Sequence, residues 1–294
     1  FYVEWLGQVF PDLPAGLPRP AQERTRALAE LDRLVRGRRV SADVYELRGR
    51  LKEGLYRELR ADSLLDGAIS DYRAAAELDR HRATAWKELG SAYRSAGLYS
   101  DALLAIQHAF EEDAFQLYRL ELLRSQFDAA LLDQRSDLAA EACRTGLAEA
   151  PRDMRFLDCE VQLWSRTRSD RRSAAAMRAR VDSLGVRESG TLLGALRELW
   201  VADVLARAGL GDSADHVARR ATANQPADWQ PLLLAESAYL RILRRDADSA
   251  LALLTAAVRR DPNMRRYIRT APWFQPLRAD PRFARLAEGN STPP

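Results

Sequence analysis

Residues 83–110 read ATAWKELGSAYRSAGLYSDALLAIQHAF, and the spacing within this stretch decides the fold. Four residues recur at the i, i+3, i+4, i+7 spacing that places side chains on one face of a helix: Trp86, Leu89, Gly90 and Tyr93. Gly97 predicts the end of that helix, because a residue without Cβ readily adopts the left-handed conformation of a helix terminus. A second amphipathic helix follows, with one face formed by Ala102, Ile106 and Ala109. The stretch therefore predicts an antiparallel helix pair whose backbones approach closely at small residues.

This helix pair resembles the tetratricopeptide repeat family. The resemblance rests on six residues, which are expected to form the repeat core: Trp86, Leu89, Gly90, Tyr93, Ala102 and Ala109. The family usually closes each unit with a proline, and Ala114 stands at that place here. The spacing of the second helix recurs in four other segments, at Ala68, Tyr72 and Ala75; Ala139, Cys143 and Gly146; Ala214, Ala218 and Ala221; and Ala250, Leu254 and Ala257. The prolines that follow the last two segments, Pro226 and Pro262, lie 36 residues apart.

The resemblance implies an all-α fold, a right-handed superhelical solenoid of stacked antiparallel helix pairs, with about six pairs and terminal capping elements. One pair cannot bury its apolar face alone, so neighbouring pairs stack and share a continuous core. We expect residues 1–20 to form an apolar N-terminal arm and a Pro-rich linker, and residues 21–262 to form the repeats. Residues 263–294 are expected to form a C-terminal cap, with aromatic residues such as Trp273 covering the last repeat, and a flexible Ser/Thr/Pro tail.

The composition argues against several classes of function. The chain has 45 basic and 42 acidic residues, a net charge of only +3, whereas dedicated nucleic-acid-binding domains carry a concentrated basic excess. No run of about 18 apolar residues occurs, so we expect no transmembrane segment in this chain. The three histidines lack metal-ligand spacing, and no nucleophile or phosphate-binding motif occurs. The sequence therefore predicts a protein that is not an enzyme, binds no cofactor or metal, and has other proteins as partners.

The two cysteines could form a disulfide and the C-terminal tail could carry a glycan, and each feature also has a non-covalent explanation. Stacked neighbouring helices could bring Cys143 and Cys159 close enough for a disulfide, which requires Cα atoms within about 7 Å. The alternative is two small buried apolar side chains. Asn290 begins an N-x-T sequon, which predicts a glycan if the protein is secreted and otherwise arises by chance.

In the tetratricopeptide repeat family the first helix of each pair lines a concave groove, and this implies a partner-binding site. On that face we expect Arg50, Arg57, Arg60, Lys87, Arg94, Arg124 and Arg155. The same face is expected to carry Glu53, Ser91, Asp128 and Asp158, so its first half is basic. A basic groove favours an acidic peptide; the alternative is that these cations are simply solvated. Some family members clamp a peptide carboxylate with lysine and asparagine. Lys87 matches one such position, but Ser91 and Glu121 replace the others, so the clamp is not expected.

The first ten residues, FYVEWLGQVF, are unusually apolar. As a helix they form a stripe of Phe1, Tyr2, Trp5, Leu6, Val9 and Phe10, followed by a linker that contains four prolines. Three interpretations stay open: a lid on the protein's own core, an arm that docks into another subunit, or a membrane-proximal stub.

Two functional hypotheses follow. The first is an exported bacterial protein that self-assembles into an oligomer or filament through its solenoid ends and its arm. The first residue is not methionine, which favours a periplasmic, cell-surface or extracellular location over the cytoplasm, and arginine outnumbers lysine as in GC-rich bacterial genomes. The second is a C-terminal sensor or docking region of a larger signalling protein, a kinase or transcriptional regulator, that binds a partner peptide in the groove.

Overall fold

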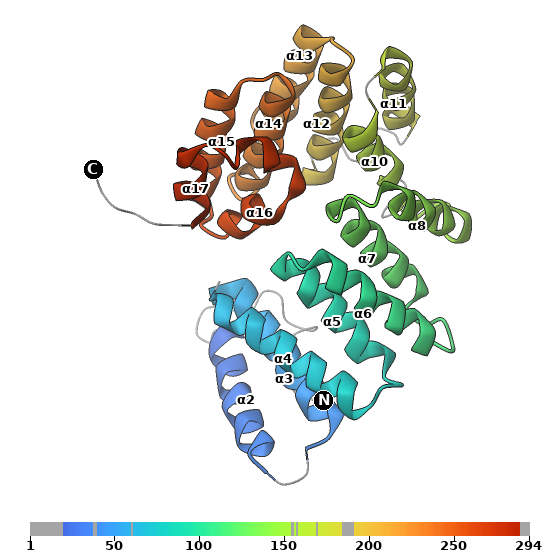
Figure 1. The fold of residues 1–294 in the computed structure, drawn as a ribbon, viewed down its shortest axis with the longest axis vertical. Coiled ribbons are helices and arrows are strands. Elements are labelled where there is room, and N and C mark those ends of the chain that lie inside the picture. Colours follow the sequence, from blue (N-terminus) through green and yellow to red (C-terminus); the bar gives the residue numbers. More distant parts are fainter. Residues whose placement is uncertain are drawn as a thin grey trace. The chain divides into compact units, whose positions relative to one another are not determined.

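The computed structural model describes residues 20–37, 40–59, 61–153, 156, 158–168, 170–183 and 191–288. Within these ranges the chain is helical, with short turns between helices and no β-strand (Figure 1). Several predicted site residues lie outside the described residues: Phe1, Tyr2, Trp5, Leu6, Val9, Phe10, Arg60, Arg155 and Asn290. In the described part of the chain, no helix combines the length and the apolar character that crossing a bilayer requires.

The chain divides into two compact units, Phe1–Ser125 and Gln126–Pro294. In the first unit, α3 packs against α4 and α5 against α6, while α2 packs on α3 and α4 on α5. The helices of this unit are α2 (Pro20–Val35), α3 (Ala42–Leu59), α4 (Asp62–Leu78), α5 (Ala83–Ala96) and α6 (Tyr99–Glu112), followed by α7 (Arg119–Leu132), which continues into the second unit.

Residues 83–110 form the predicted pair α5 and α6. Leu89, Ala102 and Ala109 are almost completely buried, and Tyr93 is 8% exposed. Gly97 ends α5 with a φ angle of 82°, and the following N–H of Leu98 donates to the carbonyl of Tyr93 at 2.9 Å. Trp86 is half-buried, and its ring lies 4.6 Å from the ring of His108 on α6. The core of this repeat is therefore built from the residues that the spacing placed there.

The second unit continues the same arrangement. α11, α13 and α15 pack against α10, α12 and α14 respectively, while α10 packs on α12 and α12 on α14. The elements are α8 (Ser136–Glu149), α10 (Cys159–Thr167), α11 (Arg171–Ser183), α12 (Leu192–Arg207), α13 (Gly211–Thr222), α14 (Gln230–Leu243), α15 (Ala247–Arg260), α16 (Met264–Thr270), the 3-10 helix η2 (Pro272–Leu277) and α17 (Pro281–Glu288).

The C-terminal elements cover the apolar side of the last repeat. Phe274, Leu277 and Phe283 are buried in the same core as residues of α14 and α15, including Leu254 and Val258. The Tyr267 ring meets that of Phe274 edge-on, with ring centroids 5.9 Å apart. A repeat at the end of a stack has no neighbour to cover it, so these aromatic side chains replace the missing helix pair.

The approach of α6 to α5 at Gly90 generates a prediction. A Cβ at this position would lie 2.8 Å from Cγ1 of Ile106, which is 1% exposed and has no room to move. Gly90→Ala should therefore lower the free energy of unfolding of this unit by about 1–2 kcal/mol, because overpacking outweighs the helix-propensity gain of about 1 kcal/mol. Urea unfolding measures the change.

Gly54→Ala is the matched control in the same unit. A Cβ there meets only the flexible side chain of Arg24, at 3.4 Å, so the same substitution should stabilise by about 0.5–1 kcal/mol. Stabilisation by both substitutions would contradict the close approach at Gly90.

Candidate functional site

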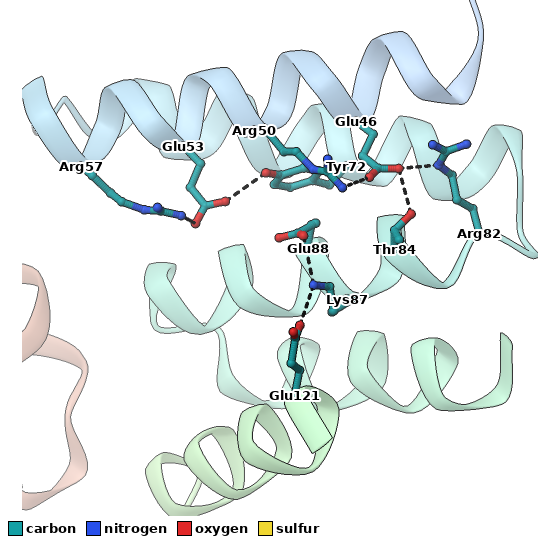
Figure 2. Close-up of polar contacts among 10 residues, drawn as sticks. All are labelled: Glu46, Arg50, Glu53, Arg57, Tyr72, Arg82, Thr84, Lys87, Glu88 and Glu121. Carbon is teal, nitrogen blue, oxygen red and sulfur yellow. Dashed lines mark hydrogen bonds and ion pairs between the residues drawn. The ribbon is translucent and has the colours of Figure 1, made fainter. Parts of the chain in front are cut away.

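Three alternate helices of the first unit, α3, α5 and the start of α7, place charged side chains on one shared face. Figure 2 shows these side chains pointing toward one another across the gaps between the helices. We call this surface the polar face and define it by Glu46, Arg50, Glu53, Arg57, Lys87, Glu88 and Glu121.

Glu46 holds one end of the polar face. Its carboxylate accepts from Arg50 at 2.5 Å, from the hydroxyl of Thr84 at 3.0 Å, and from Arg82 (Figure 2). The Glu46 side chain is only 4% exposed, and a buried carboxylate is tolerated when charged donors satisfy it. Thr84 and Arg82 flank the beginning of α5, so this carboxylate ties α3 to the next repeat.

Glu53 links the polar face to the core. Its two oxygens accept from Arg57 at 2.8 Å and from the hydroxyl of Tyr72 on α4 at 3.0 Å. Tyr72 is fully buried, and desolvation together with the charge of Glu53 raises the pKa of Tyr72 far above its ordinary value. The Tyr72 hydroxyl therefore stays protonated and donates to Glu53 throughout the physiological pH range.

Lys87 bridges α5 to α7. Its ammonium lies 2.9 Å from Glu121 and 3.4 Å from Glu88, and 4.8 Å from the centroid of the Tyr118 ring. Burial by itself lowers the pKa of Lys87, but the hydrogen bond to Glu121 and the two neighbouring carboxylates outweigh it, so the pKa lies above its ordinary value. Glu121 therefore pairs with Lys87, the lysine that matches a position of the carboxylate clamp.

Glu88 is the least compensated carboxylate of the polar face. Burial raises the pKa of Glu88, the attraction of Lys87 and Arg50 offsets only part of this, and the repulsion of Glu53 adds to the rise. Glu88 thus costs stability when it is ionised.

The structure changes the electrostatics expected for the groove. Arg50, Arg57 and Lys87 each pair with a carboxylate, so the face is of mixed charge rather than basic. Glu46 and Arg50 are four residues apart, a spacing at which a helical ion pair can be predicted from the sequence. Ion pairs between different helices have no such local spacing.

Two other predicted groove cations, Arg94 and Arg124, lie among the described residues. Arg94 is half-buried, and its Nε has no acceptor among the described residues. Arg124 is also half-buried and has an interaction partner. Whether these cations bind a partner stays a prediction.

Cys143 and Cys159 are joined by a disulfide in the structure, with Cα atoms 5.8 Å apart. The bridge connects α8 to the first residue of α10 and lies in the interior, since the two residues are 3% and 0% exposed. Of the two alternatives that the sequence left open, the structure has the covalent one. No group of three potential metal ligands gathers anywhere in the described ranges.

No protein-family model and no curated protein sequence matches the chain. Solved structures do. A tetratricopeptide repeat protein from Parabacteroides merdae is 14% identical over 86% of this chain and 93% of its own, with a TM-score of 0.62.

The chain has a tetratricopeptide repeat fold. A chain of the APC/C hetero-tetramer Cut9–Hcn1 matches 98% of this chain at 12% identity and a TM-score of 0.50, although the match spans 51% of that longer chain. The predicted all-α solenoid of tetratricopeptide-like helix pairs is thereby confirmed.

The raised pKa of Glu88 generates a prediction about pH. The folded state holds the Glu88 proton more tightly than the unfolded state, so ionisation of Glu88 lowers the free energy of unfolding as pH rises from about 4.3, the ordinary value for glutamate, through the folded pKa. Glu88→Gln should therefore unfold at a higher temperature than the natural chain at pH 7, and the difference should vanish below that window.

Glu121→Gln is the control on the same face. Glu121 is 53% exposed and is the nearer partner of Lys87, so its neutralisation removes an ion pair without relieving burial. It should not raise the unfolding temperature at pH 7. An equal gain from both variants would contradict the special position of Glu88.

Proposed function

We propose that this chain is a non-catalytic scaffold that binds segments of other proteins on its polar face. The observation that carries the proposal is the set of ion pairs on α3, α5 and α7, three alternate helices, of which Lys87–Glu121 joins α5 to α7 (Figure 2). Charges arranged in a fixed register select partners by complementarity, since like charges placed opposite each other cost several kcal/mol. A protein segment that carries both signs of charge is therefore a better match than a purely acidic peptide.

The exposure of the charged groups supports exchange with a partner. The side chains of Arg57 and Glu121 are 70% and 53% exposed, whereas Glu46 is almost completely buried. Exposed ion pairs contribute about 0–1 kcal/mol, so a partner can replace them at little cost. The buried carboxylates hold the helices in place while the outer cations exchange their partners.

Arg57 tests this role with an internal control. Arg57→Glu should reduce the recovery of a partner that co-purifies with the chain from its native cells, because it places a third carboxylate beside Glu53 and Glu88. Arg33→Glu is the matched control, since Arg33 on α2 is 68% exposed and also pairs with a glutamate on its own helix. Quantitative mass spectrometry measures the recovery, and titration calorimetry with the identified partner measures its affinity.

Equal recovery with both variants would show that the polar face is not the binding site. Loss with both would indicate an unspecific charge effect and would also contradict the proposal.

We further propose that the protein is exported and assembles with copies of itself through the N-terminal arm. The support lies in the sequence of residues 1–10, in which six of the seven apolar or aromatic side chains, all but Val3, have an amphipathic spacing. A contact from the arm of one copy to the body of the next is heterologous, and such contacts form filaments unless the rotation closes a ring. A chain that stays a 33.1 kDa monomer at every concentration would contradict the proposed self-assembly.

The disulfide supports the proposed location outside the cytoplasm. Disulfides persist in oxidising compartments and are rare in the cytosol. The bridge closes a loop with a sequence separation of 16, for which about 3 kcal/mol of stabilisation is expected from the unfolded chain. Reduction should therefore lower the free energy of unfolding of the second unit by about 2–4 kcal/mol.

Alkylation under denaturing conditions and without reductant, on protein from its native cells, measures the state of the cysteines, because unfolding exposes any free thiol. Unlabelled Cys143 and Cys159 are expected, and two labelled thiols would contradict the proposed compartment. A Cys143→Ala/Cys159→Ala variant serves as the control for the unfolding measurement, because the reductant should not change its stability.

A further inference from the structure

The last elements of the second unit concentrate positive charge that the total for the chain conceals. Residues 259–288 contain eight arginines and three acidic residues, a net charge of +5, whereas the whole chain has a net charge of +3. The other residues therefore have a net charge of −2. A surface with an excess of one sign selects partners of the opposite sign.

The core fixes two of these arginines side by side on α16, at the C-terminal end of the second unit (Figure 1). Met264 and Ile268 are 8% and 0% exposed and anchor this helix among the apolar residues of α14 and α15. Arg265 and Arg269 each follow one of these anchors. Because they are four residues apart, they lie on the same side of the helix, with Cβ atoms about 5–6 Å apart.

Arg278 extends this pair. It directly follows η2, whose Phe274 and Leu277 are buried in the same core. The guanidinium of Arg278 donates to the backbone carbonyl of Arg269 at 3.1 Å, so the two residues are neighbours, and both are exposed. We call the surface formed by Arg265, Arg269 and Arg278 the arginine patch.

The arginine patch lacks the internal ion pairs of the polar face. In the part of the chain that the structure describes, no carboxylate forms an ion pair with Arg265, Arg269 or Arg278. Arg282 on the adjoining α17 differs, since it pairs with Asp280 at 2.7 Å. The Nε of Arg265 is buried and has no acceptor among the described residues. Unpaired guanidinium groups with an unsatisfied buried N–H favour a ligand that supplies anionic acceptors.

The surroundings of the arginine patch favour carboxylates of a protein over the phosphates of a membrane. Surfaces that bind membranes combine cations with apolar side chains that enter the bilayer. The exposed large apolar side chains of the described residues all lie in the first unit, from Leu34 to Leu117, and none accompanies the patch.

Nucleic acids fit the arginine patch less well than carboxylates for two further reasons. Single strands stack on exposed aromatic rings, whereas the aromatic residues of α16 and η2, which are Tyr267, Trp273 and Phe274, are half-buried or buried. Proteins that bind a duplex make about 6–10 phosphate contacts, more than three arginines supply.

We propose that the arginine patch binds an acidic segment of another protein, an extended segment with aspartate or glutamate at alternate positions. Alternate residues of an extended chain are about 6.6 Å apart, which is close to the spacing of Arg265 and Arg269. Each guanidinium can donate two parallel hydrogen bonds to one carboxylate. The patch consists of other residues than the polar face, so the chain has a second binding surface with a different charge preference.

Fluorescence anisotropy with a defined probe tests this assignment. The probe is a labelled peptide in which glutamate and serine alternate, titrated with the full chain at low ionic strength. The same peptide with glutamine in place of glutamate is the control probe. The natural chain should bind the glutamate peptide at least about tenfold more tightly than the glutamine peptide, because only the first supplies carboxylates.

Charge reversal locates the binding. Arg269→Glu/Arg278→Glu should weaken binding of the glutamate peptide by about tenfold or more, because it places like charges opposite each other. Arg219→Glu/Arg220→Glu is the matched control, since it makes the same charge change at two exposed arginines of α13 in the same unit and should bind almost as the natural chain does. Arg269→Gln/Arg278→Gln, which adds no carboxylate, should also weaken binding. Circular dichroism verifies that each variant is folded.

The other outcomes would overturn the proposal. A natural chain that does not prefer the glutamate peptide has no site for acidic segments. Equal affinity of the natural chain and both charge-reversal variants would place the binding elsewhere, and equal loss in both variants would indicate a general effect of net charge. Sedimentation with vesicles that contain anionic lipid, and titration of single-stranded DNA, complete the comparison. Binding of either one through Arg269 and Arg278, without binding of the peptide, would identify a membrane or a nucleic acid as the partner instead.

Discussion

The absence of a side chain at a few helix positions is the constraint on which the rest of the structure depends. At Gly49 on α3, a Cβ would lie 2.7 Å from the ring of Tyr72, so only glycine lets α4 approach this closely. That approach brings the Tyr72 hydroxyl to Glu53, which in turn holds Arg57 on the polar face. Gly90 gives Ile106 the same access to α5. Close helix contact and the placement of charges are thus two consequences of one steric condition.

The stacking of helices also brings many of the arginines against carboxylates. Many of them compensate carboxylates of another helix, in the same or a neighbouring pair, rather than extending into solvent. Arg48 pairs with Asp71 at 2.5 Å, and the buried Arg197 donates to Asp158 at 3.0 Å. Such pairs add little net stability, because desolvation offsets most of the attraction, but removal of one partner leaves an uncompensated buried charge. They fix which helix faces which.

The sequence predicted the core better than the charged surfaces. Ala68, Ala139, Ala214 and Ala250 lie at helical spacings that the sequence displays directly, and all are completely buried. The pairing of Lys87 with Glu121 spans 34 residues, and that of Arg166 with Glu236 spans 70. No local pattern encodes these partners. A helix wheel identifies the cations of the groove but not the carboxylates that neutralise them.

The sequence by itself determined the helix pairs, their small-residue contacts and the aromatic cap, because each depends on the period of one helix or on a turn between two. Only the tertiary structure decided which charges compensate one another, that Cys143 and Cys159 meet, and that Trp273 lies beside Arg207. The physical reason is distance along the chain: side chains that lie tens of residues apart meet only after the repeats have stacked, and the angle of that stacking depends on all the packed side chains together.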